Sequence, residues 1–449
     1  MTPAPKHNAS DIRPTSARLS RRGVLRGGLA GVAGLAAPSF AAACDKPDTG
    51  TGTGGSGGKA TVRVWTWYNE QRDEWPKLVS EFQSANPNVV VQNRVFGDPA
   101  SYLPALQAAV AAADPPEIFA PHVLAIEYGK AGVSANLTAD LGEDFLKDFF
   151  KSTRDEYTDS GKQYALGWMA QTFGIFYDPD LFAKAKAEVP ETWDDLKVTA
   201  AKLRAIGKLP LAVSNNPGTS GLDFFLPLIT QVADDPQLVL DLDLQRNGAR
   251  WDSAPVVQAL AKVDELNKGG AFVPNANALQ GPQAEQLLYT GRAAMLFSGS
   301  WTPQGFVQDA PPEFVKRYKV AETPAWAAGR KHWTANQAGA GLAVSNNSKN
   351  KAAALDFIKF IYDPQRYTRT MNNSNSMPST QAAGAQVSNP ILKLMTQWLL
   401  DGKGAPHILF GKGSSDSAAN GLAALIGGQS TPEQAGKAIQ SAVERAQRK

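Results

Sequence analysis

Three tryptophans stand where the sequence predicts that strands end, a fourth, Trp333, stands in a predicted polar and aromatic loop over 331–337, and polar residues follow or accompany all four. The tryptophans are Trp67, Trp168, Trp301 and Trp333, and the polar neighbours are Asn69, Glu70, Gln171, Ser300 and Asn336. An exposed indole has a flat apolar face that matches the C–H face of a sugar ring, while amide, hydroxyl and carboxylate groups hydrogen-bond to sugar hydroxyls. We therefore expect these residues to surround a site for a neutral carbohydrate.

Two further positions are compatible with either a ligand contact or a purely structural role. His122 follows the third predicted strand, and it suits a ligand contact as well as a structural histidine with satisfied hydrogen bonds. Asn216 lies in an Asn-Asn-Pro-Gly run, which is typical of a turn but also follows a predicted strand. The tryptophans at periodic positions are expected in cores, and these are Trp65, Trp75, Trp193 and Trp398.

The sequence offers little support for catalysis. Its histidines form no HxxxH pair, and neither a Gly-x-Ser-x-Gly elbow nor a phosphate-binding Gly-Lys-Ser/Thr motif is present. The one cysteine, Cys44, excludes an intrachain disulfide, a CxxC redox pair and a multi-cysteine metal site. A pair of carboxylates acting on a glycosidic bond stays open, because no pair is singled out among many. We predict a protein that is not an enzyme and that uses no metal and no cofactor.

Strands and helices alternate from residue 60 onwards. Strands are predicted over 60–67, 89–91, 117–120, 164–169, 174–177, 209–214, 293–297 and 341–344, and helices over 73–85, 102–113, 192–206, 221–232, 254–267 and 351–361. Strands separated by helices of ten or more residues pair in parallel, and ligands bind beyond the carboxyl ends of such strands. The expected fold class is therefore α/β, with two lobes and a ligand cleft between them.

Residues 1–43 are predicted to be an export signal. Arg21 and Arg22 precede an apolar, Gly/Ala-rich run that ends in three alanines before Cys44. This order resembles a twin-arginine (Tat) signal peptide with a lipoprotein cleavage site, in which case Cys44 becomes the lipidated first residue. Ala41 stands where bacterial lipoproteins usually have Leu, so cleavage that leaves Cys44 unlipidated is the alternative.

Residues 44–59 then read as a Gly/Thr-rich tether, with few side chains that a core could bury. We expect an exported protein that is anchored to the outer face of the cytoplasmic membrane, at the cell surface or in the periplasm.

The charge of the chain argues against nucleic-acid binding. The chain has 45 basic and 42 acidic residues, but six of the basic residues and one acidic residue lie in 1–43, which leaves 39 against 41 for the remainder. A body that is slightly acidic lacks the basic surface that nucleic acids require.

Five sequence fragments, in order along the chain, resemble the extracellular solute-binding proteins of bacterial ABC importers, which include maltose-binding-type sugar receptors. The fragments are Val-Arg-Val-Trp-Thr-Trp at 62–67, Pro-Glu-Thr-Trp-Asp-Asp-Leu at 190–196, the run 289–301 that ends in Gly-Ser-Trp, the run 339–353, and Met-Pro-Ser at 377–379. Together they cover most of the chain after the leader.

The resemblance implies a periplasmic-binding-protein-like fold whose two lobes close around the ligand. We place the N-lobe at 60–170 plus 325–368 and the C-lobe at 171–324 plus 369–449. The implied partners are a mono- to oligosaccharide, the permease subunits of an ABC transporter and the membrane through Cys44, with the protein itself a monomer. The alternatives are a polyol, a glycerol-phosphate-like compound or a peptide as ligand, or a secreted glycoside-acting enzyme.

Overall fold

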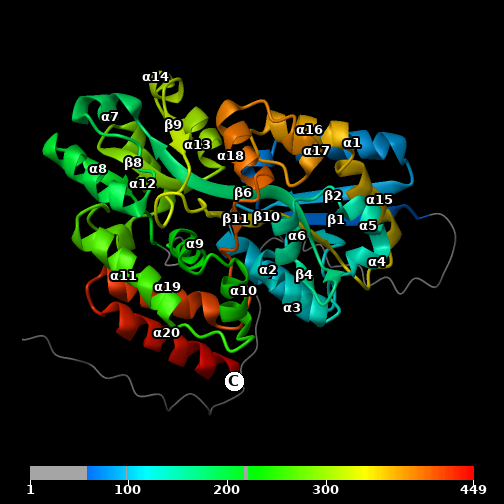
Figure 1. Cartoon of the computed structure of the whole chain (residues 1–449). Coiled ribbons are helices and arrows are strands. Elements are labelled where there is room, and N and C mark those ends of the chain that lie inside the picture. Colours follow the sequence, from blue (N-terminus) through cyan, green and yellow to red (C-terminus); the bar gives the residue numbers. More distant parts are fainter. Residues whose placement is uncertain (1–57, 98, 217–220, 449) are drawn as a thin grey trace, which may run out of the picture. The chain divides into compact units, whose positions relative to one another are not determined.

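The computed structural model describes residues 58–97, 99–216 and 221–448, which belong to one compact unit (Figure 1). The predicted export signal, the tether up to residue 57 and Cys44 lie outside the described residues. Within the described part of the chain, no helix is both long enough and apolar enough to cross a membrane.

The described strands form one large mixed sheet and a small hairpin. The strands of the large sheet are β1 (Ala60–Thr66), β2 (Val89–Val95), β3 (Ile118–Phe119), β6 (Leu166–Tyr177), β7 (Leu209–Ala212), β8 (Ala293–Gly299), β9 (Lys319–Ala321), β10 (Thr334–Val344) and β11 (Gly404–Ala405), and those of the hairpin are β4 (Thr158–Asp159) and β5 (Lys162–Gln163). The order along the large sheet is β2-β1-β3-β10-β6-β8-β7, with β11 beside β10 and β9 beside β6.

The helices lie on both sides of this sheet (Figure 1). In the first half of the chain they are α1 (Trp75–Ala85), α2 (Pro99–Ala111), α3 (Ala125–Lys130), α4 (Leu137–Leu141), α5 (Glu143–Leu146), α6 (Lys151–Glu156), α7 (Pro179–Ala185), α8 (Trp193–Ala205), α9 (Leu222–Ala233), α10 (Gln237–Leu244) and α11 (Ala254–Lys268). They continue with α12 (Gly281–Tyr289), α13 (Thr302–Asp309), α14 (Pro312–Val315), α15 (Lys351–Ile361), α16 (Pro364–Asn373), α17 (Gln381–Gly384), α18 (Pro390–Leu400), α19 (Ser414–Ile426) and α20 (Pro432–Gln447). Short 3-10 helices are η1 (Asn69–Gln71), η2 (His122–Leu124) and η3 (Ala276–Ala278).

The predicted α/β fold is confirmed, and the parallel pairing of β1 with β2 and β3 and of β7 with β8 is as expected. Two local predictions are wrong. The strand pieces at 164–169 and 174–177 form one continuous strand, β6, and the region after Trp333 is the start of β10 rather than a loop. The polar residues in 334–337 do not show a strand pattern, and this part of β10 is stabilised by its pairing with β6.

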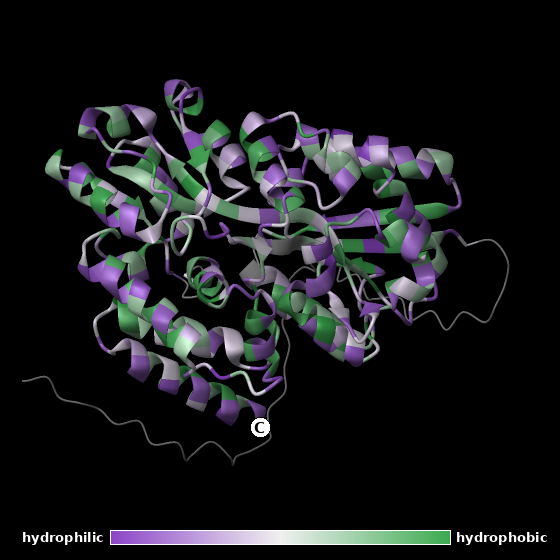
Figure 2. Ribbon diagram, in the orientation of Figure 1, coloured by the Kyte–Doolittle hydropathy of each residue, from purple (hydrophilic) through white to green (hydrophobic). Residues whose placement is uncertain are grey.

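The apolar residues gather into cores on either side of the middle of β6. The first core draws on residues 62–169 and 340–383, and the second on 173–297 together with Ala335 and residues 409–443. A third cluster, from Phe150 to Leu399 along the chain, covers β6 and β8 with side chains of α12, α13 and α18. Helices such as α11 and α20 carry both hydrophilic and hydrophobic residues, as expected for helices with one buried face (Figure 2).

Segments of the described chain that pass between the first core and the other two clusters include β6, β10 and the stretch from α16 to α18, whereas the stretch around β11 leads from the third cluster to the second core. The lobe boundaries 60–170 plus 325–368 and 171–324 plus 369–449 stay predictions.

Candidate functional site

The carboxyl ends of four strands converge on the middle of β6. Because β3 runs antiparallel to β10 and β8 runs antiparallel to β6, the ends of β3 and β8 face each other from opposite directions. Strand β1 is parallel to β3, and β7 is parallel to β8. The carboxyl end of β1 therefore points in the direction of the β3 end, and that of β7 in the direction of the β8 end. Loop residues at the ends of such strands are the usual ligand contacts of α/β proteins.

Four of the predicted site residues line one pocket at this convergence. These are Glu70 after β1, Gln171 in β6, and Ser300 and Trp301 after β8. Gln304, Asn375 and Ser376 were not predicted, and they complete the polar lining from α13 and from the segment after α16. The pocket has a volume of about 20 Å³, room for about one water molecule. A pocket of this volume is too small for a sugar ring.

Trp301 is the aromatic residue of this pocket, and it is exposed. The residue is 39% exposed, and its ring meets Phe173 edge-on at a centroid distance of 5.1 Å. The ring also lies directly over Gly299, where an added Cβ would stand 2.2 Å from a ring carbon. Glycine at this position is therefore required for the indole to hold its orientation.

Trp67 and His122 lie next to each other at the ends of β1 and β3. Their rings are 5.4 Å apart, and Trp67 also contacts Tyr102 at 4.8 Å. His122 has a φ of +50°, a strained conformation for a residue other than glycine, and its Nδ1 is buried without a hydrogen-bond partner among the described residues. Burial lowers the pKa of His122, so the ring is neutral near pH 7. Strain and an unused polar atom favour the ligand-contact interpretation of this histidine.

Asn69 and Glu70 belong to the 3-10 turn η1, and its third residue, Gln71, holds the turn in place. Gln71 accepts a hydrogen bond from the indole of Trp168 and donates one to Ser374 Oγ at 3.3 Å. This buried network fixes η1 against β6 and against the segment after α16. Burial raises the pKa of Glu70. Asn69 is exposed, and its amide donates to the Gly97 carbonyl at 2.6 Å instead of lining the pocket.

The prediction that Trp168 presents its ring to the cleft is wrong. Trp168 is fully buried in the first core, where it stacks on Trp75 at 5.4 Å. Nearly every residue of β6 is buried because helices cover both faces of the strand, so the alternation that would show the direction of each side chain is absent.

Trp333 and Asn336 are also buried. Trp333 is 9% exposed, its Nε1 donates to Asp234 Oδ1 at 3.0 Å, and the Lys331 ammonium lies 3.8 Å from its ring centroid. Asn336 is completely buried, and neither end of its amide has a hydrogen-bond partner among the described residues. Neither side chain lines the pocket at the strand ends.

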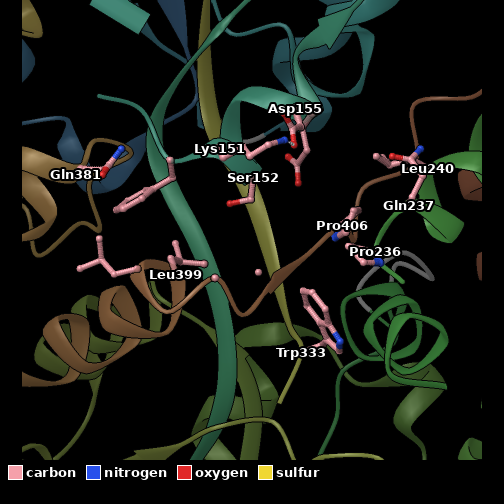
Figure 3. Close-up of a pocket in the computed structure, with 15 residues that line it drawn as sticks. Lys151, Ser152, Asp155, Pro236, Gln237, Leu240, Trp333, Gln381, Leu399 and Pro406 are labelled. Carbon is pink, nitrogen blue, oxygen red and sulfur yellow. Dashed lines mark hydrogen bonds and ion pairs between the residues drawn. The ribbon is translucent and has the colours of Figure 1, made fainter. Parts of the chain in front are cut away.

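Trp333 lines a separate cavity of about 540 Å³ that is named here the hinge-side cavity (Figure 3). Its walls come from α6, the start of α10, and the stretch from the end of α18 to Pro406. Figure 3 shows Trp333 across the cavity from Lys151, Ser152 and Asp155. Trp333 is the one predicted site residue that lines it.

Asn216 lies in the loop after β7, where the structure favours the turn interpretation. Its amide reaches the Ala278 carbonyl at 3.4 Å, while Asn215 donates to Asn277 at 2.7 Å and accepts from the Gly221 amide at 3.1 Å. These contacts hold the loop against η3 and the start of α9.

The sequence did not predict a histidine–aspartate pair that contacts Phe173, the residue on which Trp301 also packs. His407 Nδ1 lies 2.7 Å from Asp223 Oδ1, and the His407 ring meets Phe173 at 5.0 Å. Burial raises the pKa of Asp223, and the contact with His407 opposes that rise. The two residues are 184 positions apart, and neither belongs to a motif that would connect them. In the described part of the chain, no group of three or more His, Cys, Asp or Glu side chains has the arrangement of a metal site.

Comparison with known proteins shows the same architecture. The structure is similar to that of a chitin oligosaccharide binding protein, with a TM-score of 0.74, 22% identity, and coverage of 88% of this chain and 100% of the other. A cyclic alpha-maltosyl-1,6-maltose binding protein from Arthrobacter globiformis gives a TM-score of 0.73 at 19% identity, covering 87% and 99% of the two chains. These similarities confirm the predicted two-lobed periplasmic-binding-protein-like fold.

Sequence comparison agrees with the structural one. The chain is 23% identical over 343 residues to a multiple sugar-binding protein of Streptococcus mutans, covering 74% of this chain and 77% of the relative. The model of the family described as bacterial extracellular solute-binding protein matches residues 68–366, more than half of the chain. The resemblance expected from the five sequence fragments is thereby confirmed, and the chain belongs to the bacterial extracellular solute-binding protein family.

Proposed function

We propose that this protein binds a carbohydrate outside the cytoplasm and delivers it to the permease of an ABC importer. The observation that carries the proposal is the pocket at the four strand ends, where the exposed indole of Trp301 stands among Glu70, Gln171 and Ser300. An aromatic face beside amide, hydroxyl and carboxylate groups matches a sugar ring and its hydroxyls. The relatives named as binding chitin oligosaccharides, cyclic maltosyl-maltose and multiple sugars support the same ligand class.

We further propose that binding involves closure of two lobes built on the separate cores. The pocket of about 20 Å³ is too small for a sugar, and its walls include Met169 from the first core and Ala170 and Met377 from the third cluster. A hinge in β6 and β10 lets the halves separate and then enclose the ligand, and the permease would read the closed form. The export signal over 1–43 and the lipid anchor at Cys44 complete the proposal, since they would hold the protein at the outer face of the membrane.

A secreted glycoside-acting enzyme is the alternative from another functional class. It needs two carboxylates on either side of the glycosidic bond, roughly 5–10 Å apart. Among the described residues that line the pocket, Glu70 is the one carboxylate, which favours binding without turnover.

The first test is thermal unfolding of the mature chain with a panel of mono-, di- and oligosaccharides, polyols and glycerol phosphates. A ligand that binds only the folded state raises the unfolding midpoint. A shift with one group of sugars, without any product in the mixture, is the expected result. No shift with any saccharide would contradict carbohydrate binding and leave polyols, glycerol phosphates or peptides as candidates.

Trp301→Ala tests the pocket itself. We expect affinity for the identified sugar to fall at least about tenfold, because the stacking face is lost, while the unfolding midpoint of the free protein stays nearly unchanged. Val307→Ala on the same helix is the matched control, since Val307 is 55% exposed and lies outside the pocket. Calorimetry that gives both variants the affinity of the original protein would remove Trp301 from the site.

A further inference from the structure

The pocket at the strand ends has an unbalanced charge. Its lining contains the carboxyl group of Glu70, while the other described lining residues are neutral: Met169, Ala170, Gln171, Ser300, Trp301, Gln304, Asn375, Ser376 and Met377. The groups that act on the Glu70 carboxyl include its own backbone amide and no described cation. Glu70 thus faces the ligand space without a counter-charge from the protein.

Three other shielded carboxylates of this protein are paired with cations. Glu117 lies 3.0 Å from Arg63, Asp178 lies 2.9 Å from Arg317, and Glu74 lies 2.6 Å from Lys77, although the three acidic side chains are only 2–8% exposed. A carboxylate removed from water costs free energy unless a partner compensates it.

Buried carboxylates without a cation accept hydrogen bonds from neutral groups instead, as Asp243 does from the Phe410 and Gly411 amides and Glu285 does from Thr302. The Glu70 carboxyl has neither kind of partner among the other described residues, so its partner would come from outside the chain.

The neighbours of Glu70 would recognise the rest of such a partner. The Trp301 indole offers an exposed π face, which attracts cations as well as sugar C–H groups. Gln304 donates nothing to Glu70 but accepts from the Asn375 amide at 2.9 Å, and this bond links α13 to the segment after α16 across the pocket. Gln171 and Ser300 add neutral hydrogen-bonding groups for hydroxyls.

We infer that the ligand is a saccharide with a protonated amino group, which pairs with Glu70 beside the Trp301 ring, and that saccharides with a carboxylate or phosphate are disfavoured. This inference rests on the proposed carbohydrate-binding function. It names the ligand's charge, which neither the family nor the relatives define. An ammonium group would form a charge-assisted hydrogen bond, whereas an anionic sugar would face Glu70 with no described cation in the pocket to offset the repulsion.

The test compares cationic, neutral and anionic saccharides of the same ring configuration, with the amino group at C2 and the carboxylate at C6, by calorimetry at pH 7 with the mature full-length protein. The three series are glucosamine, glucose and glucuronate; galactosamine, galactose and galacturonate; and chitobiose with free amino groups, cellobiose and cellobiouronate. In any series whose neutral member binds, we expect the amino member to bind about tenfold more tightly or better and the acid to bind more weakly than the neutral sugar.

Glu70→Gln should abolish this order while the protein stays folded. The substitution keeps the side-chain shape and removes an uncompensated charge, so the unfolding midpoint of the free protein should be equal or higher. Glu127→Gln, at an exposed position away from the pocket, is the matched control and should keep the preference.

The outcomes separate the inference from the function on which it rests. If neutral sugars bind as well as amino sugars, or if Glu70→Gln keeps the preference, the inference is overturned and carbohydrate binding stands. If neither these compounds nor any saccharide of the thermal panel binds, the proposed function fails, and the inference fails with it.

Discussion

Glu285 lies beneath the first turn of α13, the helix that begins directly after Trp301. Its Oε1 accepts a hydrogen bond from Thr302 Oγ1 at 3.4 Å, and a Cβ on Gly305 would stand 3.0 Å from its other oxygen. Burial raises the pKa of Glu285 to about 7; the hydrogen bond from Thr302 opposes this rise, and the charge of Asp309 adds to it. A carboxyl group of the unfolded chain loses its proton near pH 4.3.

This difference makes stability depend on pH. Between about pH 4.5 and pH 7 the folded state holds the Glu285 proton while the unfolded state releases it, so stability falls as the pH rises through this window. Glu285→Gln should therefore stabilise the protein at pH 8, by up to about 3 kcal/mol, and have almost no effect at pH 4.5. Thermal unfolding at the two pH values checks this, with Glu127→Gln as the control. An equal effect at both values would show that the charge of Glu285 has no part in it.

At the level of single residues, one rule predicted site residues: a tryptophan at the end of a predicted strand, with polar residues next to it, was expected to line the ligand site. Glu70, Gln171, Ser300 and Trp301 follow that rule and line one pocket. The rule fails for Trp168, because β6 is covered on both faces and a tryptophan there is buried whichever way it points. The rule does not identify Asn375, which lines the pocket, or His407, which contacts Phe173. Both residues are distant from the strand ends along the chain and come near them only in the folded protein.

Helix α8 illustrates how much one local signal can predict at the level of elements. Thr192 and the acidic residues after it predicted a helix start, and the structure has a capping box in which Thr192 Oγ1 accepts from the Asp195 amide at 3.2 Å and Asp195 accepts from the Thr192 amide at 2.9 Å. The helix then buries Trp193, Leu196 and Leu203 in the second core.

Thr192→Ala should lower the free energy of unfolding by about 1 kcal/mol, because the first turn of α8 loses one of its hydrogen-bond acceptors. Ser253→Ala is a matched comparison at the N-terminus of α11, where the serine hydroxyl is buried and makes no capping bond. That variant should be neutral or slightly more stable. Urea unfolding of both proteins measures the difference, and equal losses would contradict the role of the capping box.

Elements without such signals were harder to predict. The strand β10 begins with Thr334, Ala335 and Asn336, a polar stretch whose conformation comes from pairing with β6 rather than from its own residues. The two-residue strand β11 exists only because Gly404 and Ala405 pair with that same stretch. The helices that carry one apolar face, such as α11 and α15, were found over nearly their full length because their periodicity is local.

For the whole molecule, the proposed closure of the two lobes involves both the pocket at the strand ends and the hinge-side cavity. The pocket at the strand ends is almost closed at about 20 Å³, whereas the hinge-side cavity is open at about 540 Å³. If the halves rotate about β6 and β10 with the two spaces on opposite sides of these strands, the cavity narrows whenever the pocket opens. A bulky side chain in the cavity would then oppose opening.

Ser152→Trp should consequently bind the identified sugar about fivefold more tightly or better, mainly through slower dissociation. Ser152→Ala controls for the loss of the hydroxyl group and should bind as the original protein does. Surface plasmon resonance resolves the two rates. Unchanged or weaker binding of Ser152→Trp would show that the cavity takes no part in closure.

The sequence predicted two lobes from the resemblance, but the arrangement of the cores depends on pairings between distant segments. The first core takes side chains from 62–169 and again from 340–383, and β10 lies between β3 and β6 in the sheet. No local pattern in the sequence specifies that insertion.

The same insertion determines when the protein can fold during its synthesis. A ribosome makes β1, β2, β3 and β6 long before β10, which appears only after about three quarters of the chain. Until then β3 and β6 lack the strand that joins them, and their apolar faces stay exposed on the growing chain. The first core is completed only near the end of translation, so the nascent protein needs protection from aggregation for most of its synthesis.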